Sequence, residues 1–491
     1  MTAARARVPR LGPGAVYLRA LDPLFRAHPD LIRVAEIEPS TMWVRATAPD
    51  ARPRGSALEL RDLSGLPQSK LLHGVGYPVG GLICDQDLHV GEFCRWAEAL
   101  EAPWVSEHLS VLEVSGAQGP AACGFLMPPL QTEAGVDLAV ANIVRRRDRL
   151  GRPFAFETGV SYFAPRADEM ADGAFFAAVA QGADCGVLLD LANLTVNDRN
   201  GRDAVEQVLA CLPLDQVWEL HLAGSEFAQG YWLDAHCGAI GPELAALAAD
   251  VVADLPHLGA IIFEVAADRL PGFGETAFLR QMEIVAGLWD AAGSGRSAVV
   301  SRLAPAPRRR SPASVTPADW EALIATRLLP PALRPADARN DIADPHAFAL
   351  YAALIAAFRR GAIADLLENT VRLLLADLGL ARIDALFDAH FATTPPSLYP
   401  SDDALAFAAF LETAALELPG LDDIAAFEAG VIRAASDDRP VQVRLRRPLD
   451  ALLTAIASGA PIDLPEGAAY GVEIVGPEGL RLLALEPEPA S

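Results

Sequence analysis

Eight short apolar runs, rich in β-branched and aromatic residues, recur between residues 15 and 266, and they constrain the fold more than any other feature. Amphipathic helical patterns separate most of these runs, for example at 87–102, 134–151 and 242–255. Buried strands that alternate with helices are typical of a parallel sheet whose faces are covered by helices. Eight such strands predict an α/β fold of the (β/α)8 TIM-barrel type. The runs lie at 15–21, 31–38, 70–76, 103–110, 153–159, 185–191, 217–224 and 260–266.

A doubly wound sheet is the alternative fold, but no glycine-rich phosphate motif follows the first run. The chain of 491 residues is long enough for a large barrel plus a second domain. Residues 293–318 are rich in Gly, Ser, Pro, Ala and Arg, and we interpret them as a linker between a barrel domain (1–292) and a second domain (319–491). Ala/Leu-rich helical patterns and a few strand-like segments predict that the second domain is smaller, α+β and mostly helical.

The bulk composition excludes several classes of protein. A formal net charge of −24 argues against a nucleic-acid binder, which needs a basic face. The six cysteines form no C-x-x-C pair, so we expect free thiols in a reducing cytoplasm. We find neither an apolar signal-peptide core nor a run of about 18 apolar residues, and we therefore expect a cytoplasmic protein without a membrane partner.

Polar residues gather where the apolar runs end, which is where barrel enzymes place their chemistry. Four of the nine histidines and several carboxylates stand at successive strand ends or in the loop after the seventh strand. Imidazole and carboxylate groups suit iron, manganese or zinc. Their number exceeds what one ion needs, so we expect more than one metal ion. The candidate ligands are His73, His108, Glu157, Asp190, Asn193, His221, Asp234, His236 and Glu264, with Asn193 supporting or sharing the metal of Asp190.

Each of these residues also has an ordinary structural interpretation. His73 could be a buried core histidine, and Asp190 could cap the polar loop that we expect at 191–201. Two arginines, Arg199 and Arg269, could neutralise Glu157 and Glu264. Because candidate ligands stand at six successive strand ends and in their loops, we favour a metal site over a separate ordinary explanation for each residue. We expect the remaining histidines to be surface or helix residues, namely His28, His89, His257, His346 and His390.

Several motifs occur in one order and at a specific spacing. They are "WVSEHLS", "FETGVSYF", "LLDLANLTVNDRNG", "WELHLAGSEFAQGYWLDAHCG" and "IIFEV". Together they resemble the multinuclear non-haem iron-dependent oxidases, the family of the methanobactin-biosynthesis oxidase, over roughly residues 10–290. The resemblance implies a TIM barrel that uses several irons and dioxygen to modify a ribosomally made precursor peptide, typically at cysteine. It places all nine candidate ligands at matching positions, and we assign catalytic roles to Asp190, His221 and Glu264.

Four positions depart from the pattern of that family. Glu107 stands where the family usually has Asp, and Ala192 replaces the first of two adjacent asparagines. The segment 157–159 reads "ETG" in place of Glu-Asn-Pro, and 38–43 reads "EPSTMW" where Pro-Glu-Asn is common. The metal ligands are thus retained while the lining of the pocket differs. The resemblance therefore leaves the peptide and its product open.

The second domain resembles, with lower specificity, the partner proteins that are encoded beside these oxidases and that help to hold the leader of the precursor peptide. A fusion would raise the effective concentration of the partner and make a separate partner protein unnecessary. The C-terminal strand pattern could accept the leader along an open sheet edge, and the basic segment 444–447 could attract an acidic leader. The alternative is that this sheet only caps the helices.

Two other functions stay open from the sequence. A barrel with His, Asp and Glu on its rim could be a divalent-metal isomerase, like xylose isomerase, or a phosphoester hydrolase. The chain could also be a metal-binding peptide carrier without catalysis. Iron content and oxygen consumption would distinguish the first alternative, and peptide binding without a change of mass would identify the second.

Overall fold

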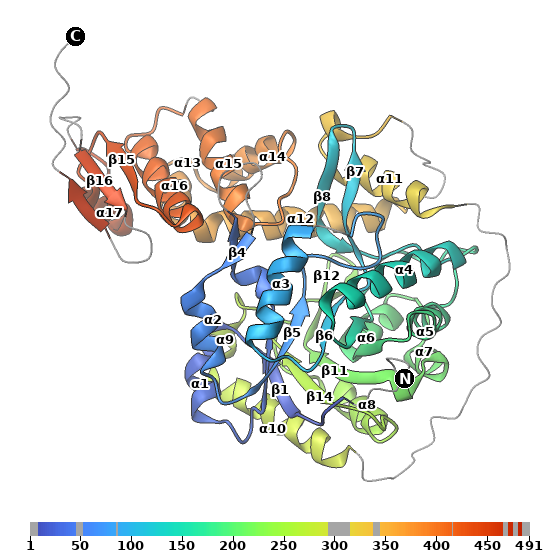
Figure 1. The fold of residues 1–491 in the computed structure, drawn as a ribbon. Helices are drawn as coiled ribbons and strands as arrows, with labels where there is room; N and C mark the ends of the chain where they lie inside the picture. The colour runs from blue at the N-terminus through green and yellow to red at the C-terminus, as the bar shows by residue number, and fades with distance from the viewer. Residues whose placement is uncertain are drawn as a thin grey trace.

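Eight parallel strands close into one barrel in the computed structural model, in the order β1, β14, β11, β10, β9, β6, β5 and β2 (Figure 1). Each strand overlaps one of the apolar runs, so the predicted TIM barrel is confirmed and the doubly wound alternative is wrong. The strands are β1 (Gly12–Val16), β2 (Val34–Ile37), β5 (Ser69–Gly74), β6 (Val105–His108), β9 (Phe154–Glu157), β10 (Gly186–Asp190), β11 (Val217–Ala223) and β14 (Ala260–Glu264). The structure describes residues 8–45, 53–84, 87–292, 315–336, 344–414, 416–464, 470–474 and 480–483.

The first strand differs from its prediction. It begins at Gly12, earlier than the expected run 15–21, and Arg19–Leu21 form a 3-10 helix instead. A Cβ at position 14 would come within 2.5 Å of Val34 in β2, so the close pairing of β1 and β2 requires a glycine there. Gly-Pro-Gly is a turn signal when only the sequence is considered, which explains why the start of this strand was missed.

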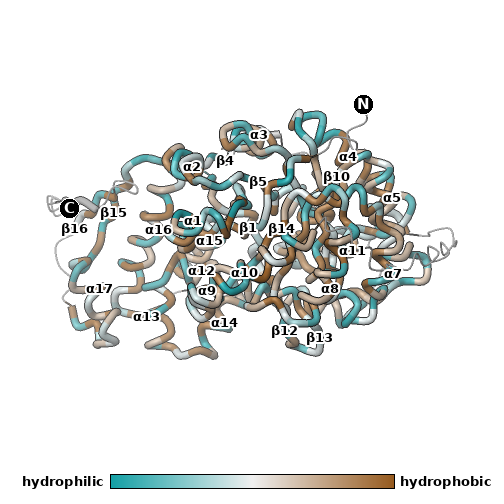
Figure 2. Tube along the Cα trace, turned by 90° about the horizontal axis from the view of Figure 1, so that it is seen from below, coloured by the Kyte–Doolittle hydropathy of each residue, from teal (hydrophilic) through white to brown (hydrophobic). Residues whose placement is uncertain are grey.

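Helices surround the barrel and pack their apolar faces on its strands. Figure 2 shows hydrophobic segments concentrated in the middle of the barrel. Among the side chains of the surrounding helices, Trp96 and Phe278 are fully buried. These helices are α1 (Asp22–Ala27), α2 (Ala57–Ser64), α3 (Asp87–Ala99), α4 (Glu133–Leu150), α5 (Asp172–Ala183), α6 (Leu191–Arg199), α7 (Val205–Cys211), α8 (Pro242–Val252), α9 (Leu270–Phe273) and α10 (Glu275–Ala291). The three helical patterns given as examples correspond to α3, α4 and α8.

Helix α6 corrects the prediction of a polar loop after the sixth strand. Asp190 ends β10 and caps α6, because its Oδ1 accepts a hydrogen bond of 2.7 Å from the backbone N–H of Asn193. Asp is among the preferred N-cap residues. The many Asn, Asp and Thr residues of this stretch are turn formers in isolation, but the cap and the buried face of α6 make them helical.

Three antiparallel hairpins extend the loops at the C-terminal ends of barrel strands. They follow β2, β6 and β11 in the chain and therefore stand on the face where the candidate ligands lie. The hairpins are β3 (Trp43–Arg45) with β4 (Pro53–Gly55), β7 (Val111–Gly116) with β8 (Gly119–Met127), and β12 (Ser225–Ala228) with β13 (Tyr231–Asp234).

The C-terminal part is mostly helical, as predicted. Its first helix begins at Pro317, inside the expected linker 293–318, because Thr316 and Asp319 form a capping box. Residues 293–314 lie outside the described residues. The helices are α11 (Pro317–Leu328), α12 (Pro345–Leu366), α13 (Glu368–Leu378), α14 (Leu380–Phe391), α15 (Pro400–Thr413), α16 (Leu421–Asp437) and α17 (Leu449–Ser458).

A small antiparallel sheet completes this part, in the order β15 (Val441–Leu445), β16 (Tyr470–Ile474) and β17 (Leu480–Leu483). The expected basic patch beside it does not include all of its arginines. Arg447 is buried, and its Nη1 lies 3.0 Å from Oδ2 of Asp423. Arg446 faces Asp422 at 3.8 Å. Arg447 is therefore not available to attract an acidic leader, whereas Arg446 is largely exposed and its part in such an attraction stays a prediction.

Helix α12 is long and apolar enough to cross a membrane by length and composition alone, which the scan of the sequence for apolar runs did not reveal. It carries Arg359, whose buried guanidinium lies 2.7 Å from the carboxylate of Asp403 in α15. Its other contacts are with α11, α13, α15 and β8. These contacts join α12 to neighbouring C-terminal helices and to the β7–β8 hairpin, and 39% of its apolar window is buried.

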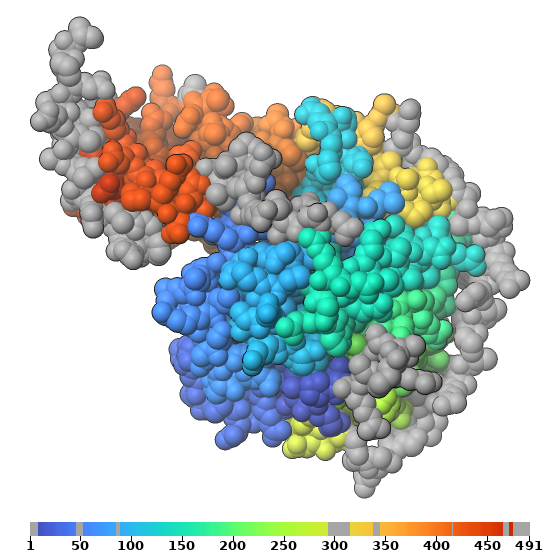
Figure 3. All heavy atoms as spheres, viewed as in Figure 1, coloured from blue at the N-terminus to red at the C-terminus, as the bar shows by residue number. Residues whose placement is uncertain are grey.

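The β7–β8 hairpin and the first C-terminal helices share one hydrophobic core. Trp320 of α11 donates a hydrogen bond of 2.9 Å from its indole N–H to the carbonyl of Pro128, and Phe163 stacks against Tyr351 of α12 at 5.1 Å. Val114 and Met127 of the hairpin are fully buried in the same cluster. Figure 3 shows the cyan hairpin between the yellow and orange helices. The helices α13–α17 bury a separate core of their own.

Candidate metal centre

The predicted ligands meet at the C-terminal ends of the barrel strands. Three groups of side chains each bring their nitrogen and oxygen atoms within 4.8 Å of one another. Glu157 belongs to two of the groups and His221 to two, so the groups form one continuous cluster. The groups are His73, His108 and Glu157; Glu157, Asp190 and His221; and Glu36, His221 and Glu264.

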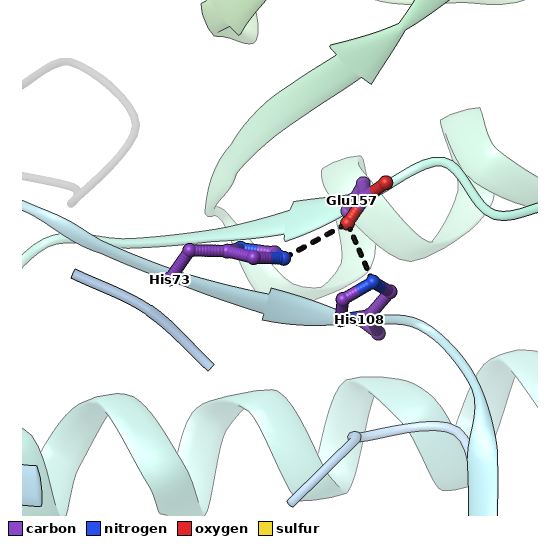
Figure 4. A group of neighbouring side chains, drawn as sticks. All are labelled: His73, His108 and Glu157. Atoms are coloured by element: carbon purple, nitrogen blue, oxygen red, sulfur yellow. Dashed lines mark ion pairs between the residues drawn. The ribbon is translucent and has the colours of Figure 1, made fainter. Parts of the chain in front are cut away.

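The first group joins three neighbouring strands. Nε2 of His73 and Nε2 of His108 lie 3.1 and 3.0 Å from the same oxygen, Oε2 of Glu157 (Figure 4). Nδ1 of His108 lies 3.0 Å from the carbonyl of Gly74, and Nδ1 of His73 lies 2.9 Å from the hydroxyl of Ser106. A carbonyl accepts only, so Nδ1 of His108 carries a proton, and Nε2 is the ring nitrogen that faces Glu157. This is the arrangement of a histidine that is oriented to bind a metal.

His221 occupies the middle of the cluster and is fully buried. Its Nδ1 lies 3.1 Å from Oε1 of Glu264, and its Nε2 lies 3.1 Å from Oε1 of Glu36. Glu36, on β2, was missed by the sequence analysis. The available signal was Glu36 itself, one of two acids in the apolar run "LIRVAEIE", because a buried charge at such a position needs a partner.

Asp234 and His236 close the cluster on the side of the β12–β13 hairpin. Nε2 of His236 lies 3.1 Å from Oδ1 of Asp234 and 3.4 Å from Oε2 of Glu264. His236 adopts a φ of 45°, which is uncommon for a residue other than glycine. Its side chain is 32% exposed, whereas those of His73 and His221 are buried. The cluster is therefore most open to solvent at His236.

Several buried polar atoms of the cluster have no hydrogen-bond partner among the described residues. Ring nitrogens approach some of them within 3.4 Å, but without the angles of a hydrogen bond. Burying such atoms is costly unless a partner compensates them, and a cation would be a partner for all of them. The side chains present therefore fit a metal centre. The atoms are Oε1 of Glu36, Oε2 of Glu157, Oδ2 of Asp190, Oδ1 of Asn193, Nδ1 of His221, Oδ1 of Asp234 and Oε2 of Glu264.

The protonation of the cluster reflects an excess of carboxylates. Burial opposes a charge on His108 and His221, but Glu157 beside the first and Glu264 beside the second outweigh it and raise both pKa values well above the usual range. The pKa of Asp190 is raised by burial and by the carboxylates of Asp234 and Glu157. The cluster thus attracts positive charge, which protons supply when no metal is bound.

The ordinary interpretations explain little of this cluster. Arg199 pairs with Glu243 at 2.9 Å and Arg269 pairs with Glu226 at 3.2 Å, so neither arginine neutralises Glu157 or Glu264. Asp190 does act as a cap, as the alternative proposed, but only through Oδ1. Its Oδ2 remains buried without a hydrogen-bond partner within the described part of the chain.

Polar neighbours hold the ligands in place. The amide of Asn193 donates a hydrogen bond of 3.1 Å to Oε1 of Glu157, which leaves Oε2 to face the two histidines. Glu107 turns toward the backbone, where it accepts hydrogen bonds from the N–H groups of His108 and Tyr77 at 3.0 and 3.3 Å. A Cβ at Gly74 would come within 2.1 Å of this carboxylate, so the glycine makes room for the larger Glu107.

Two of the remaining histidines are less exposed than expected. His89 on α3 and His390 on α14 do lie on helices, but both are buried. Nδ1 of His257 donates a hydrogen bond of 2.8 Å to the carbonyl of Asp215, and His346 is exposed on α12. None of these side chains joins the metal-binding groups found among the described residues. All six cysteines are free thiols, as predicted.

Comparisons with known proteins identify the family. Residues 43–277 match the model of a family described as RiPP precursor modification enzyme MbnB/TglH/ChrH. The chain is 32% identical over 201 residues to a UPF0276 protein of Anaeromyxobacter sp. (strain Fw109-5), covering 41% of this chain and 70% of that protein. It is 34% identical over 173 residues to a UPF0276 protein of Chromobacterium violaceum, covering 35% of this chain and 61% of that protein.

Solved structures with a similar fold are more distant in sequence. A xylose isomerase domain containing protein from Salmonella typhimurium LT2 is 15% identical, with a TM-score of 0.38, covering 55% of this chain and 92% of that one. A D-psicose 3-epimerase is 13% identical, with a TM-score of 0.35, covering 56% of this chain and 96% of that one.

The matched region contains all nine predicted ligands, from His73 to Glu264, but not Glu36, which lies before residue 43. The C-terminal domain lies outside it, and its resemblance to partner proteins stays a prediction. The motif order, the convergence of the side chains and a relative with 32% identity over 70% of its length agree. The chain belongs to the RiPP precursor modification enzyme MbnB/TglH/ChrH family.

Proposed function

We propose that this chain binds more than one iron ion at the cluster and uses dioxygen to oxidise a ribosomally made precursor peptide at a cysteine. The observation that carries this proposal is the set of buried histidine and carboxylate atoms that face one another without hydrogen-bond partners among the described residues. Mixed imidazole and carboxylate ligands suit iron in both of its common oxidation states. A single ion would leave several of these buried atoms without a partner.

The groups suggest how the ligands are divided. His73, His108 and Glu157 would hold one ion, and Asp190 and His221 would hold a second that shares Glu157. Glu264, with Asp234 and His236 beside it, would complete the second site or form a third. When bound, iron would supply the redox chemistry for dioxygen and lower the pKa of a bound cysteine thiol.

The remaining roles belong to side chains of the chain itself. Asp190, His221 and Glu264 are the ligands to which we assign catalysis. Asn193 orients Glu157 through its amide, and Glu36 orients His221 from the opposite side of the ring. The substrate would approach at His236, where the cluster is most exposed. The fused C-terminal domain would hold the leader of the peptide, so that no separate partner protein is needed.

The proposal is tested with protein expressed in iron-rich medium and purified without chelators. We expect elemental analysis to find more than one iron per chain. A cysteine-containing precursor peptide, sought among the short open reading frames beside the gene, should lose mass or gain oxygen in a reaction that consumes dioxygen. Activity on sugars or phosphoesters with magnesium, manganese or zinc under anaerobic conditions would instead support the isomerase or hydrolase alternative. At most one metal per chain would contradict the multinuclear centre.

A further inference from the structure

A cavity of about 720 Å³ lies where the barrel loops meet the C-terminal domain. One wall is the tip of the β7–β8 hairpin, where small residues at 116 and 119–122 line the cavity. The opposite wall is formed by residues 393–399, between α14 and α15. Its volume lies in the range of roughly 300–1,000 Å³ that is typical of ligand sites. None of the nine candidate metal ligands lines it, so the cavity is distinct from the cluster.

His89 lies in the barrel-side wall of this cavity. Its buried ring stacks on Tyr77, with 4.2 Å between the centroids, and faces Tyr399 of the C-terminal domain at 5.9 Å. Neither ring nitrogen has a hydrogen-bond partner among the described residues. Burial, with a smaller contribution from Arg45, lowers the pKa of His89 to about 4. The imidazole is therefore neutral near pH 7 and offers one donor and one acceptor.

Arg45 adds a third polar atom to this wall. Its guanidinium pairs with Asp402 and lies over the ring of Tyr399, 5.7 Å from the centroid. Its Nε is buried without a hydrogen-bond partner in the described part of the chain. Since the charge of Arg45 is already met by Asp402, and Glu113 also lines the cavity, the wall suits neutral polar groups better than an anion.

A short series of contacts connects this cavity with the cluster. Tyr77, which stacks on His89, donates its backbone N–H to Glu107, and Glu107 also accepts from the backbone N–H of His108. His108 is a candidate metal ligand. The cavity therefore lies beside the cluster and on the same face of the barrel.

We propose that this cavity binds an extended segment of the peptide substrate, away from the residue that is modified. The inference rests on the proposed function, which makes a peptide the substrate. Glycine and alanine in the hairpin wall leave room for a main chain to approach closely. The donors and the acceptor of His89 and Arg45 match the carbonyl and N–H groups that such a segment presents. Walls from both domains also give the fused domain a direct part in holding the substrate.

The test fills the cavity in the full-length, iron-loaded protein. Ala121→Trp places an indole in the hairpin wall, and Ala249→Trp, on the exposed face of α8, is the matched control. The probe is a labelled synthetic cysteine-containing peptide that the wild-type protein oxidises, and its binding is measured by fluorescence anisotropy without dioxygen. We expect binding to Ala121→Trp to be weaker by about tenfold or more, and binding to the control to change by less than about twofold. Equal binding to wild type and Ala121→Trp would overturn the inference.

A second measurement covers the case in which Ala121→Trp does not fold. The photoreactive residue p-benzoyl-phenylalanine replaces Gln118 at the cavity, and Ala249, on the exposed face of α8, is the control position. Cross-links from position 118 alone, suppressed by excess unlabelled peptide, support the inference, and cross-links from neither position overturn it. A peptide that binds in the cavity without consuming dioxygen refutes the oxidase proposal only. If Ala121→Trp oxidises the peptide with the KM of the wild-type protein, the proposed role of the cavity is wrong and the oxidase proposal stands.

Discussion

Glu36 and His221 lie 3.1 Å apart inside the barrel, and both side chains are fully buried. The carboxylate meets Nε2, so the ring presents Nδ1 to Glu264 and the rest of the cluster. We predict that Glu36→Gln weakens the metal affinity of this site by about 10- to 100-fold, as loss of an orienting partner typically does. Iron per chain, measured over a series of free iron concentrations, checks this.

A matched control separates this effect from a general loss of negative charge. Glu243 pairs with Arg199 at the surface, outside the cluster, and Glu243→Gln should leave the iron content unchanged. The ion at His73, His108 and Glu157 should also survive in Glu36→Gln. If both ions are lost together, the two groups do not load independently, and the division of ligands proposed above is wrong.

Asp190 has two functions that a substitution can separate. Asn is as good an N-cap as Asp, so Asp190→Asn should keep α6 and change the unfolding free energy little. It removes the charge of the buried Oδ2, and we therefore expect loss of one iron and of turnover. Thermal unfolding and elemental analysis of the same sample decide between the two effects. His257→Ala, far from the cluster, should alter neither quantity.

Glu321 on α11 makes stability depend on pH. Its Oε1 accepts a hydrogen bond of 2.6 Å from the backbone N–H of Leu82, while Oε2 is buried without a partner among the described residues. Burial raises its pKa from 4.5 to about 7. Folding thus favours the protonated form, and the contribution of Glu321 to stability falls as the pH rises from about 4.5 to about 7. Glu321→Gln, which is always neutral, should be the more stable protein above pH 7.

The comparison for Glu321 is a pair of denaturant titrations at pH 5 and pH 8. The gap between wild type and Glu321→Gln should be wider at pH 8. A gap that is the same at both pH values would show that Glu321 keeps its ordinary pKa in the folded protein.

Trp320 tests how much the core shared by the β7–β8 hairpin and the first C-terminal helices contributes to the unfolding free energy. The side chain is buried against Phe163 and bonded to the carbonyl of Pro128, so Trp320→Ala should cost about 3–5 kcal/mol of unfolding free energy. Phe358→Ala, at a position 63% exposed on α12, should cost less than about 0.5 kcal/mol. Denaturation followed by circular dichroism measures both. An unchanged midpoint for Trp320→Ala would show that the shared core contributes little.

The eight barrel strands could be predicted because strands buried on both faces appear as continuous apolar runs. The ligand positions followed, since the end of each run marks the active face of a barrel. Asp190 and His221 could be placed by this argument alone. The helix after Asp190 could not, because its Asn and Asp residues favour turns until a cap and a buried face fix them. Gly12 and Gly14 of β1 caused the opposite error, because Gly-Pro-Gly indicates a turn although it lies inside a strand.

Other parts of the site depend on contacts that no local pattern contains. Glu36 and His221 are 185 residues apart in the chain, and only closure of the barrel brings them together. His89 belongs to the barrel helix α3 and faces Tyr399 of the C-terminal domain. The burial of His89 therefore depends on how the two domains dock. Arg447 looked like part of a basic patch, because the acid that neutralises it, Asp423, comes from α16, more than 20 residues earlier.

The shared core of the β7–β8 hairpin also sets the order in which the nascent protein can fold. Met127 is made 224 residues before Tyr351, which belongs to the same cluster. At about 5–20 residues per second, the ribosome needs roughly 10–45 s to cover this distance. During that time α12 is not yet available to cover the apolar face of the hairpin, and the barrel strands from β9 to β14 are themselves still being made. This face is therefore available to chaperones, and slower expression at low temperature would not shorten its exposure.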